Sequence, residues 1–303
     1  MKIYAPSYYK NFKCIAGECK HSCCTGWEID IDSETYRKYM DEEGKLGERL
    51  RQNICHGVQP HFNLTENDRC PFLNDNNLCD IIIEKGEGML CEICHMHPRF
   101  VNFYEECEEI GVGLCCEAAA ELILKSGAAE IEVYEEGEGE LSDEEEALFT
   151  LRDNICDILK NEDKSFKDKV EEILSKYGIV LPRRTHKEWT EEYKKLERLD
   201  GKWTKVLEKS EGGVKVENEK ALEGIHSYFL FRYLPPSIYD GFIKERIAFC
   251  IHATLFIADV SSAVEEDNEF SRLSEAARLY SSEIEYSEEN VEKLISCFDI
   301  QNY

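Results

Sequence analysis

The sequence predicts a mainly α-helical protein in two parts, a cysteine-rich, loop-dominated N-terminal metal module with a few short strands and an all-helical C-terminal domain. Twelve of the fifteen cysteines lie between Cys14 and Cys116. Beyond them, helix-capping residues and apolar stretches follow one another to the end of the chain. An acidic segment separates the two regions. We therefore expect a metal-cluster module over 1–127, a linker over 128–142 and a helical domain over 143–303.

Composition and charge exclude several classes of function. A hydrophobic fraction of 42% is enough to bury a core, and a net charge of −27 without clusters of Lys or Arg argues against nucleic-acid binding. No apolar leader is visible at the N-terminus. The longest apolar run, 248–260, is interrupted by His252 and Asp259 and is shorter than the ~20 residues that span a bilayer. We expect a cytoplasmic protein without membrane or nucleic-acid partners.

Short local patterns predict the elements of the cysteine-rich module. A helix is expected over 33–52, and the apolar stretches at 81–83 and 100–104 are typical of brief strands. A helix over 116–126 closes the module, with Gly127 at its C-cap.

The rest of the chain is predicted to be helical after the acidic segment. Residues 130–146 hold ten acidic and no basic side chains. Ser142 and Glu145 then form a capping box, so a helix begins near residue 143. Further helices are expected over 165–177 ending at Gly178, over 187–209, from Asn218 to Pro235-Pro236, over 238–265 as the central buried helix, over 268–283, and over 288–299 with Ser287 as N-cap.

The cysteines follow a spacing that suits metal binding. The pattern is Cys14-x4-Cys19-x3-Cys23-Cys24, then Cys70, Cys79, Cys91-x2-Cys94 and Cys115-Cys116. In a reducing compartment such thiols are more often ligands than disulfides, and thiolates suit zinc and iron–sulfur clusters. Adjacent cysteines should point in different directions, so we do not expect Cys23 and Cys24 to bind one tetrahedral ion.

Zinc is the alternative to a [4Fe–4S] cluster. The spacings lack the paired C-x2-C rhythm of zinc ribbons, which favours iron. Three histidines lie near the cysteines and are weaker ligand candidates: His21, His95 and His97. Cysteines away from the tight spacings are expected not to be ligands: Cys55, Cys107, Cys156, Cys250 and Cys297.

These motifs identify a resemblance to the flagellin lysine-N-methylase family of bacterial and archaeal proteins, and to the broader group of zinc- or iron-chelating cysteine-cluster domains. The matching residues are Phe12-x-Cys14 through Trp27-x-Ile29-x-Ile31-Asp32, Cys70-Pro71-Phe72-Leu73 with Cys79, Leu90-Cys91-x2-Cys94-x3-Pro98-Arg99, and Leu114-Cys115-Cys116-Glu117-Ala118-Ala119. In the helical half, 228–234 and 282–287 also resemble family positions. Glu117 departs from the family pattern, which places a proline after the cysteine.

The resemblance implies transfer of a methyl group from S-adenosylmethionine to surface lysines of flagellin, and an iron–sulfur cluster. Four of the family cysteines would hold that cluster, without indication of which four. They are Cys14, Cys19, Cys23, Cys24, Cys70, Cys79, Cys94 and Cys116, to which Cys91 is added because of its spacing to Cys94.

Methylation of lysine sets requirements on the site. The amine is a nucleophile only when deprotonated, and its reference pKa is about 10.4, so the protein must remove a proton or desolvate the ammonium. Our catalytic candidates are Tyr228, Tyr233 and Glu285. The alternative is that aromatic residues at this helical spacing belong to the core.

Binding of S-adenosylmethionine suggests further candidates. Arg99 and Arg232 could bind its carboxylate, or could form structural ion pairs instead. Trp27 and Phe100 could stack on its adenine or shield the cluster. No strand is followed by G-x-G-x-x-G and a helix, so the Rossmann-like cofactor site is missing; a cluster with an open iron position could chelate the cofactor instead.

Two functions of other classes stay open at this point. One is a non-catalytic iron- or zinc-binding module with a helical partner-binding domain. The other is a redox sensor whose cluster controls binding to a partner.

Overall fold

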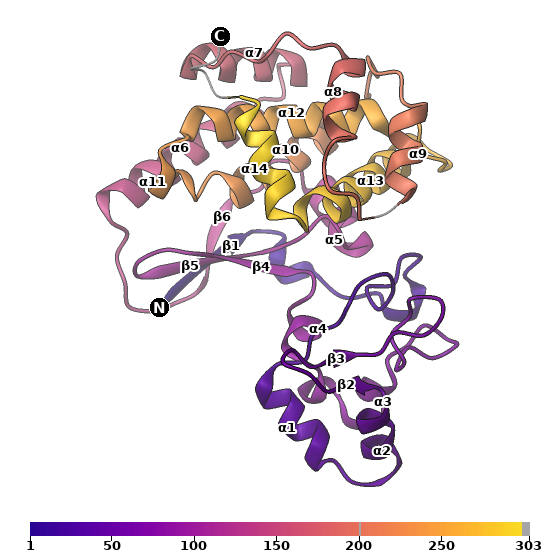
Figure 1. Cartoon of the computed structure of the whole chain (residues 1–303). Coiled ribbons are helices and arrows are strands. Elements are labelled where there is room, and N and C mark those ends of the chain that lie inside the picture. Colours follow the sequence, from indigo (N-terminus) through magenta and orange to yellow (C-terminus); the bar gives the residue numbers. More distant parts are fainter. Residues whose placement is uncertain (200, 299–303) are drawn as a thin grey trace. The chain divides into compact units, whose positions relative to one another are not determined.

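The computed structural model describes residues 1–199 and 201–298, and its chain divides into two compact units (Figure 1). Unit 1 is formed by 1–12 together with 101–303, and unit 2 by 13–100. Helices dominate the secondary structure, which confirms the mainly α class. No helix in the described part of the chain is both long enough and apolar enough to cross a membrane.

The division of the chain differs in position from the boundaries drawn on the sequence. Residues 127 and 142, the predicted ends of the metal module and the linker, both lie within unit 1. The segment 128–142 contains the strand β6 (Ile131–Glu135), which pairs with β1 (Lys2–Pro6) at the start of the chain. Alternation of Ile131 and Val133 with acidic residues gives this segment a strand pattern despite its charge.

Unit 1 contains a small mixed sheet in the order β4-β5-β1-β6. The strand β4 (Arg99–Phe103) agrees with the strand predicted over 100–104, and it is followed by β5 (Cys107–Val112). β1 runs parallel to β5, with Tyr4 opposite Glu109, and antiparallel to β6.

Ten helices are described in unit 1. They are α5 (Glu117–Ser126), α6 (Asp143–Leu159), α7 (Phe166–Tyr177), α8 (His186–Tyr193), α9 (Gly201–Lys209), α10 (Glu219–Tyr233), α11 (Ser237–Asp240), α12 (Ile243–Ser261), α13 (Glu269–Tyr280) and α14 (Glu288–Ser296). α10 and α12 pack side by side at the centre of the unit, and α5 and α13 pack against them (Figure 1).

Side-chain caps at the expected starts fix four of these helices. Ser142 and Ser165 form capping boxes, and Asn218 and Ser287 accept hydrogen bonds from the third helical backbone N–H of their helices. Gly178 ends α7 in the left-handed conformation. These helix boundaries confirm the predicted ones. They could be predicted because a cap is a local signal that tertiary packing seldom overrides.

Three predicted helices of unit 1 are wrong in extent. The helix expected over 187–209 is two helices, α8 and α9, joined by a turn; residue 200 lies outside the described residues. The helix expected over 238–265 begins only after Gly241, and α13 passes at Tyr280 into a π-helical turn, Ser281–Glu285. The prediction for 288–299 extends to a residue outside the described range.

Unit 2 is built from short elements around one apolar core. Its elements are α1 (Ser33–Asp41), α2 (Gly44–Gln52), β2 (Ile54–Cys55), β3 (His61–Phe62), α3 (Asp80–Lys85) and α4 (Glu92–Met96). The single helix expected over 33–52 breaks at residues 42–43, directly before Gly44, whose φ of 75° an L-residue rarely adopts. Asp32 is the N-cap of α1.

The strand predicted over 81–83 is wrong, because these residues belong to α3. Ile81 is buried, whereas Ile82 and Ile83 are exposed. Burial on one side only, directly after a helix N-terminus at Asp80, is consistent with a helical turn. The β-branched composition had suggested a strand.

Candidate functional site

Five predicted ligand cysteines come together in the core of unit 2. Cys70 and Cys91 are buried within this core, and Cys24, Cys79 and Cys94 pack against it. The core otherwise consists of apolar side chains such as Phe62 and Phe72. We call this set of five side chains the thiol core.

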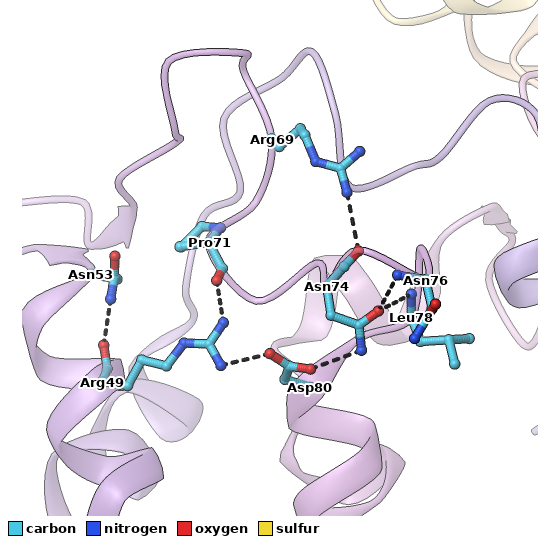
Figure 2. A network of polar contacts seen from close by, with 8 residues as sticks. All are labelled: Arg49, Asn53, Arg69, Pro71, Asn74, Asn76, Leu78 and Asp80. Carbon is cyan, nitrogen blue, oxygen red and sulfur yellow. Dashed lines mark hydrogen bonds and ion pairs between the residues drawn. The ribbon is translucent and has the colours of Figure 1, made fainter.

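A polar network holds the loop that carries two of these cysteines (Figure 2). The guanidinium of Arg49, on α2, donates to the Asp80 carboxylate (2.6 Å) and to the backbone carbonyl of Pro71. Asp80 in turn accepts from the side-chain amide of Asn74 (3.0 Å), and Asn74 accepts from backbone N–H groups of the loop. Because Cys70 precedes Pro71 and Cys79 precedes Asp80, this network fixes both ends of the loop.

The first cysteine motif is joined to the same loop through the backbone. The Cys70 N–H donates to the Cys24 carbonyl at 2.8 Å, and Gly26 N–H donates to Asp68 carbonyl at the same distance. Segments separated by more than forty residues in the printed sequence are thereby placed side by side. The backbone, and not the thiols alone, brings these sulfurs into one region.

Two helix N-termini face the thiol core. Cys79 is the N-cap of α3 and Cys91 the N-cap of α4. The N–H groups of Ile81 and Ile82 act on the Cys79 thiol, and that of Cys94 acts on the Cys91 thiol. N–H groups and helix N-termini stabilise a thiolate, which is the form that binds metal.

The thiols influence one another's protonation. Burial raises the pKa of Cys70 to about 12, and the charges of Cys24, Cys79 and Cys91 add to this rise. Burial also raises the pKa of Cys79. Hydrogen bonding to Cys94, whose Sγ lies 3.3 Å away, lowers the pKa of Cys91 and raises that of Cys94. Several thiolates here would repel one another unless a cation lay among them.

The expectation that Cys23 and Cys24 diverge is wrong. The two thiols form a hydrogen bond, which is the main cause that lowers the pKa of Cys24 to about 7. Cys23 is exposed and Cys24 is half-buried, so the pair extends from the surface into the thiol core. The Cys24 thiol is consequently more acidic than the buried Cys70 thiol beside it.

The sulfurs are more widely spread than a single tetrahedral ion requires. Four sulfurs around one zinc ion lie about 3.8 Å apart, given Zn–S distances of about 2.3 Å. Within 1–199 and 201–298, three potential ligand atoms lie within 4.8 Å of one another only in the group Glu28, Asp30 and His61, which contains no cysteine. No three sulfurs of the thiol core are therefore grouped as closely as those around one zinc ion, although the sulfurs of Cys91 and Cys94 are 3.3 Å apart.

The other predicted ligands lie outside the thiol core. Cys14 is exposed and its Sγ accepts from the Ala16 N–H at 3.3 Å, while the Cys19 thiol donates to the His21 carbonyl at 3.1 Å. Cys116 belongs to unit 1, where it is the N-cap of α5. Burial lowers the pKa of His97 to about 4, so its imidazole is neutral at neutral pH.

The second group of predicted residues meets inside unit 1. The Glu285 carboxylate oxygen Oε2 accepts from Tyr228 (2.6 Å) and Tyr233 (3.0 Å), and forms an ion pair with the guanidinium of Arg232 (3.2 Å). Arg232 also donates to the Tyr228 hydroxyl at 2.9 Å. We call these four side chains the Glu285 cluster. It unites all three predicted catalytic residues with one of the predicted arginines.

Helix geometry explains how these side chains meet. Tyr228 and Arg232 are one turn apart on α10, so they share a helix face. Gly224, earlier on the same helix, lets α10 approach α5, since a Cβ there would lie 2.4 Å from the Ile123 carbonyl oxygen. Glu285 comes from the π-helical turn after α13. Such turns often occur at functional sites.

The electrostatics of the Glu285 cluster favour a fixed arrangement. Burial raises the pKa of Tyr228 and Tyr233 well above 10, so both phenols stay protonated and donate. Burial opposes the charge of Arg232, but the neighbouring phenols and Glu285 raise its pKa overall. The second carboxylate oxygen of Glu285, Oε1, is buried and has no hydrogen-bond partner among the described residues.

A further thiol lies beside this cluster. The Tyr286 hydroxyl lies 3.3 Å from the Sγ of Cys115. Burial raises the pKa of Cys115, and Glu285 raises it further. Cys115 was not among the predicted ligands, and its proximity to Glu285 could not have been inferred from spacing.

The remaining cofactor candidates belong to unit 2 and have local partners. The Trp27 indole donates to the Cys23 carbonyl at 2.7 Å, and its ring centroid lies 6.3 Å from that of His97. Arg99 donates to the His95 carbonyl at 3.3 Å. Arg232, by contrast, belongs to the Glu285 cluster. There it forms an ion pair with Glu285, which was the alternative to binding the carboxylate of S-adenosylmethionine. Unit 1 also contains an open cavity, and none of the residues that line it was predicted as a site residue.

Comparison with known proteins finds distant relatives. The chain is 23% identical over 129 residues to a lysine-N-methylase of Salmonella choleraesuis (strain SC-B67), in a match that covers 40% of this chain and 32% of that protein. It is 24% identical over 129 residues to the flagellar biosynthetic protein FliU of Salmonella muenchen, covering 40% of this chain and 76% of FliU.

These similarities confirm the resemblance to the lysine-N-methylase family that the motifs predicted. A lysine-N-methylase of Salmonella typhimurium matches with the same identity and coverage as the first relative. The chain thus spans about a third of the length of the lysine-N-methylases that it matches. No family model and no solved structure matches the chain.

Proposed function

We propose that the chain is a protein-lysine N-methyltransferase that takes its methyl group from S-adenosylmethionine and modifies surface lysines of flagellin. Distant similarity to proteins named lysine-N-methylase supports the reaction, and similarity to a flagellar biosynthetic protein supports the substrate. The observation that carries the proposal is the Glu285 cluster, because it supplies a buried proton acceptor of the kind that amine methylation needs.

Glu285 Oε1 is the atom that we assign to the substrate amine. It is buried and lacks a partner among the described residues, so it can accept a hydrogen bond from an incoming lysine Nζ. Desolvation in such a site lowers the pKa of the lysine ammonium. In this scheme the ammonium gives one proton to Oε1, and its nitrogen lone pair is then available for attack.

Tyr228, Tyr233 and Arg232 position the acceptor. All three act on Oε2, so they hold the carboxylate in one orientation and leave Oε1 for the substrate. Methyl transfer then breaks the S–CH3 bond of the sulfonium and forms the N–CH3 bond, with the electron pair of the broken bond returning to sulfur. The released proton resides on Glu285 until solvent removes it.

The thiol core fits an iron–sulfur cluster by the chemistry of its donors. Two of its five thiols are buried and three are partly buried, two helix N-termini face them, and no three of these sulfurs lie within 4.8 Å of one another. Four of Cys24, Cys70, Cys79, Cys91 and Cys94 would hold a [4Fe–4S] cluster. When bound, such a cluster would cross-link the loops of unit 2 and supply a redox-active centre.

Methyl transfer with labelled cofactor tests the proposal. The full chain, purified without oxygen, is incubated with methyl-labelled S-adenosylmethionine and flagellin, and methyl-lysine is identified by peptide mass spectrometry. Glu285→Gln should lower kcat by about a hundredfold or more, because general-base contributions are typically of that size. The matched control is Glu289→Gln, which changes an exposed carboxylate paired with Lys293.

Two results would count against the proposed roles. No label in flagellin from protein with a full complement of iron and acid-labile sulfide would contradict the reaction. Equal kcat values for Glu285→Gln and Glu289→Gln would contradict the role of Glu285 while leaving the reaction intact.

A further inference from the structure

An open cavity of about 210 Å³ lies in unit 1, away from the residues of the Glu285 cluster. α12 contributes His252, Phe256 and Asp259 to its lining, and α8 with the segment before it contributes Arg184 and Trp189. All of these residues belong to one compact unit. The cavity is therefore a feature of unit 1 by itself.

Aromatic rings form the walls of this cavity. The rings of Trp189 and His252 are tilted by 34° with centroids 3.9 Å apart, and Trp189 stacks on Phe298 at 5.5 Å. Arg184 places its guanidinium 4.8 Å from the Trp189 ring. Rigid aromatic walls favour a ligand with an apolar or sulfur-containing part, since thioether and sulfonium sulfur both interact well with aromatic rings.

His252 contributes a buried polar atom without a partner. Only 8% of the residue is exposed, and its Nε2 makes no hydrogen bond to any described residue. Burial lowers its pKa to about 3, with Arg184 and His186 contributing, so the ring is neutral at neutral pH. An unpaired buried nitrogen costs stability, and this one lines a cavity, so a ligand atom can satisfy it.

Charges of both signs line the same cavity. Arg184 is a cation, and Asp259 is an anion whose Oδ1 accepts from the Val214 N–H at 3.2 Å and whose Oδ2 lies 3.3 Å from His186 Nδ1. Asp259 disfavours a simple anion, and Arg184 disfavours a simple cation. Arg184 also lies 4.0 Å from Glu192. A zwitterion complements both charges of the cavity, with its carboxylate toward the guanidinium and its ammonium toward Asp259.

We infer that this cavity binds the α-amino-acid group of a sulfur-containing ligand, with Arg184 and Asp259 recognising its two charges and the aromatic walls its side chain. The inference rests on the proposed function in naming the methionine end of S-adenosylmethionine as one source, and free methionine is the other. Small-molecule sites usually measure about 300–1,000 Å³, so a cavity of about 210 Å³ accommodates one end of the cofactor.

Aromatic packing links the cavity to the Glu285 cluster within unit 1. The ring of Tyr193 stacks on Phe256 with centroids 4.0 Å apart, and its hydroxyl lies 3.2 Å from that of Tyr280. The ring of Tyr280 lies 5.7 Å from that of Phe229, which in turn stacks at 6.0 Å on Tyr233 of the Glu285 cluster. Tyr193, Tyr280 and Phe229 thus form a continuous aromatic path from the cavity wall to Tyr233.

Binding measurements on the full chain test the inference without reference to turnover. Equilibrium dialysis gives the Kd of S-adenosylmethionine, methionine and adenosine for the wild type, Asp259→Asn and Arg184→Gln. Asn keeps an acceptor for Val214 N–H, and circular dichroism confirms folding of each variant. The control is Glu265→Gln, an exposed carboxylate just beyond α12 that pairs with Lys209.

We expect methionine to displace S-adenosylmethionine, and adenosine not to displace methionine. Asp259→Asn and Arg184→Gln should each weaken both amino-acid ligands at least tenfold, while Glu265→Gln leaves the Kd unchanged. Unchanged affinity in both cavity variants overturns the inference, and the proposed function survives if methyl transfer to flagellin persists. Weakened binding in the variants, combined with no methyl transfer in any assay, supports the cavity and overturns the proposed function.

Discussion

The thiol core of unit 2 and the Glu285 cluster of unit 1 solve the burial of ionisable groups in opposite ways. In the Glu285 cluster, two phenols and a guanidinium surround one carboxylate oxygen, so the protein itself compensates the buried charge. In the thiol core, burial and mutual charge hold the pKa of Cys70 and Cys79 high. In the Glu285 cluster, the carboxylate oxygen Oε1 is the atom that lacks a hydrogen-bond partner among the described residues. In the thiol core, the thiolates need a cation to be stable.

The contrast teaches which part of the molecule should depend on a bound metal. Unit 1 has large apolar helices, with α10 and α12 packed at its centre. Unit 2 has short helices and two-residue strands, and the thiols form part of its core. Small domains with so little regular structure often need a metal to fold.

Substitution of Cys91 tests this dependence and should have the largest effect. Cys91→Ser removes a fully buried sulfur at the N-terminus of α4 and should abolish most metal binding. Limited proteolysis should then cut within 13–100 and leave unit 1 resistant. Iron, sulfide and zinc contents provide the second measurement.

Cys55→Ser is the control for this experiment. Cys55 is half-buried in β2 and lies outside the thiol core, so its substitution should change neither metal content nor the proteolysis pattern. If Cys91→Ser kept the wild-type metal content, or if unit 2 resisted protease without metal, the contrast between the two units would be lost.

Acid should destabilise unit 1 through buried neutral histidines. Burial lowers the pKa of His226 to about 4 and that of His252 to about 3. Both values lie below the unfolded value of about 6.5, so stability is complete above pH 6.5 and is lost as the pH falls toward the folded values. By pH 4 each histidine should cost roughly 3 kcal/mol of unfolding free energy.

Denaturant unfolding of metal-stripped protein, followed by circular dichroism, measures this loss between about pH 7 and pH 4. His226→Leu should recover roughly half of it, because His226 is fully buried and its Nε2 has no partner among the described residues. Above pH 6.5 the slope of stability against pH should be the same in both proteins. An unchanged acid slope in the variant would assign the acid sensitivity to other groups.

Much of the helical architecture could be predicted because its signals are local. Ser142 and Ser287 cap helices where caps were predicted, helices begin after Ser165 and Asn218 as expected, and Gly178 ends one. The strand β6 was not predicted. The ten acidic residues within 130–146 suggested a linker, although Ile131-Glu132-Val133 has the alternation of a strand. Its formation depends on pairing with β1, more than a hundred residues away, which no local pattern reveals.

Prediction of the thiol core and the Glu285 cluster was limited in the same way, because their residues meet only through tertiary structure. Tyr228 and Tyr233 could be proposed from the chemistry of lysine methylation and the family resemblance of 228–234, but their meeting with Glu285 depends on a π-helical turn that lacks a sequence signature. The membership of Cys24 in the thiol core depends on a backbone hydrogen bond to Cys70. His252 and Asp259 gave one usable signal, since two ionisable residues interrupt the most apolar run of the chain.

The polar network in Figure 2 provides a further test of the contrast between the two units. We expect a substitution in this network to have the smallest effect on stability and metal binding. Arg49→Met removes the donors to Asp80 and Pro71, so the loop between Cys70 and Cys79 should loosen. Because Arg49 is partly exposed, we expect a loss of only about 1 kcal/mol in the stability of unit 2. Residues that orient metal ligands typically change affinity by about tenfold or more, so metal affinity should fall by about tenfold.

The effect of Arg49→Met should be confined to unit 2. Competition with a chelator of known affinity measures the metal, and Arg37→Met, on the exposed side of α1, is the matched control. Methionine keeps apolar contact with Phe72, over which the Arg49 guanidinium lies at 4.8 Å, so a change in metal affinity would report the lost hydrogen bonds. Equal metal affinity in the two variants would mean that the thiols alone, and not the loop that presents them, determine metal binding.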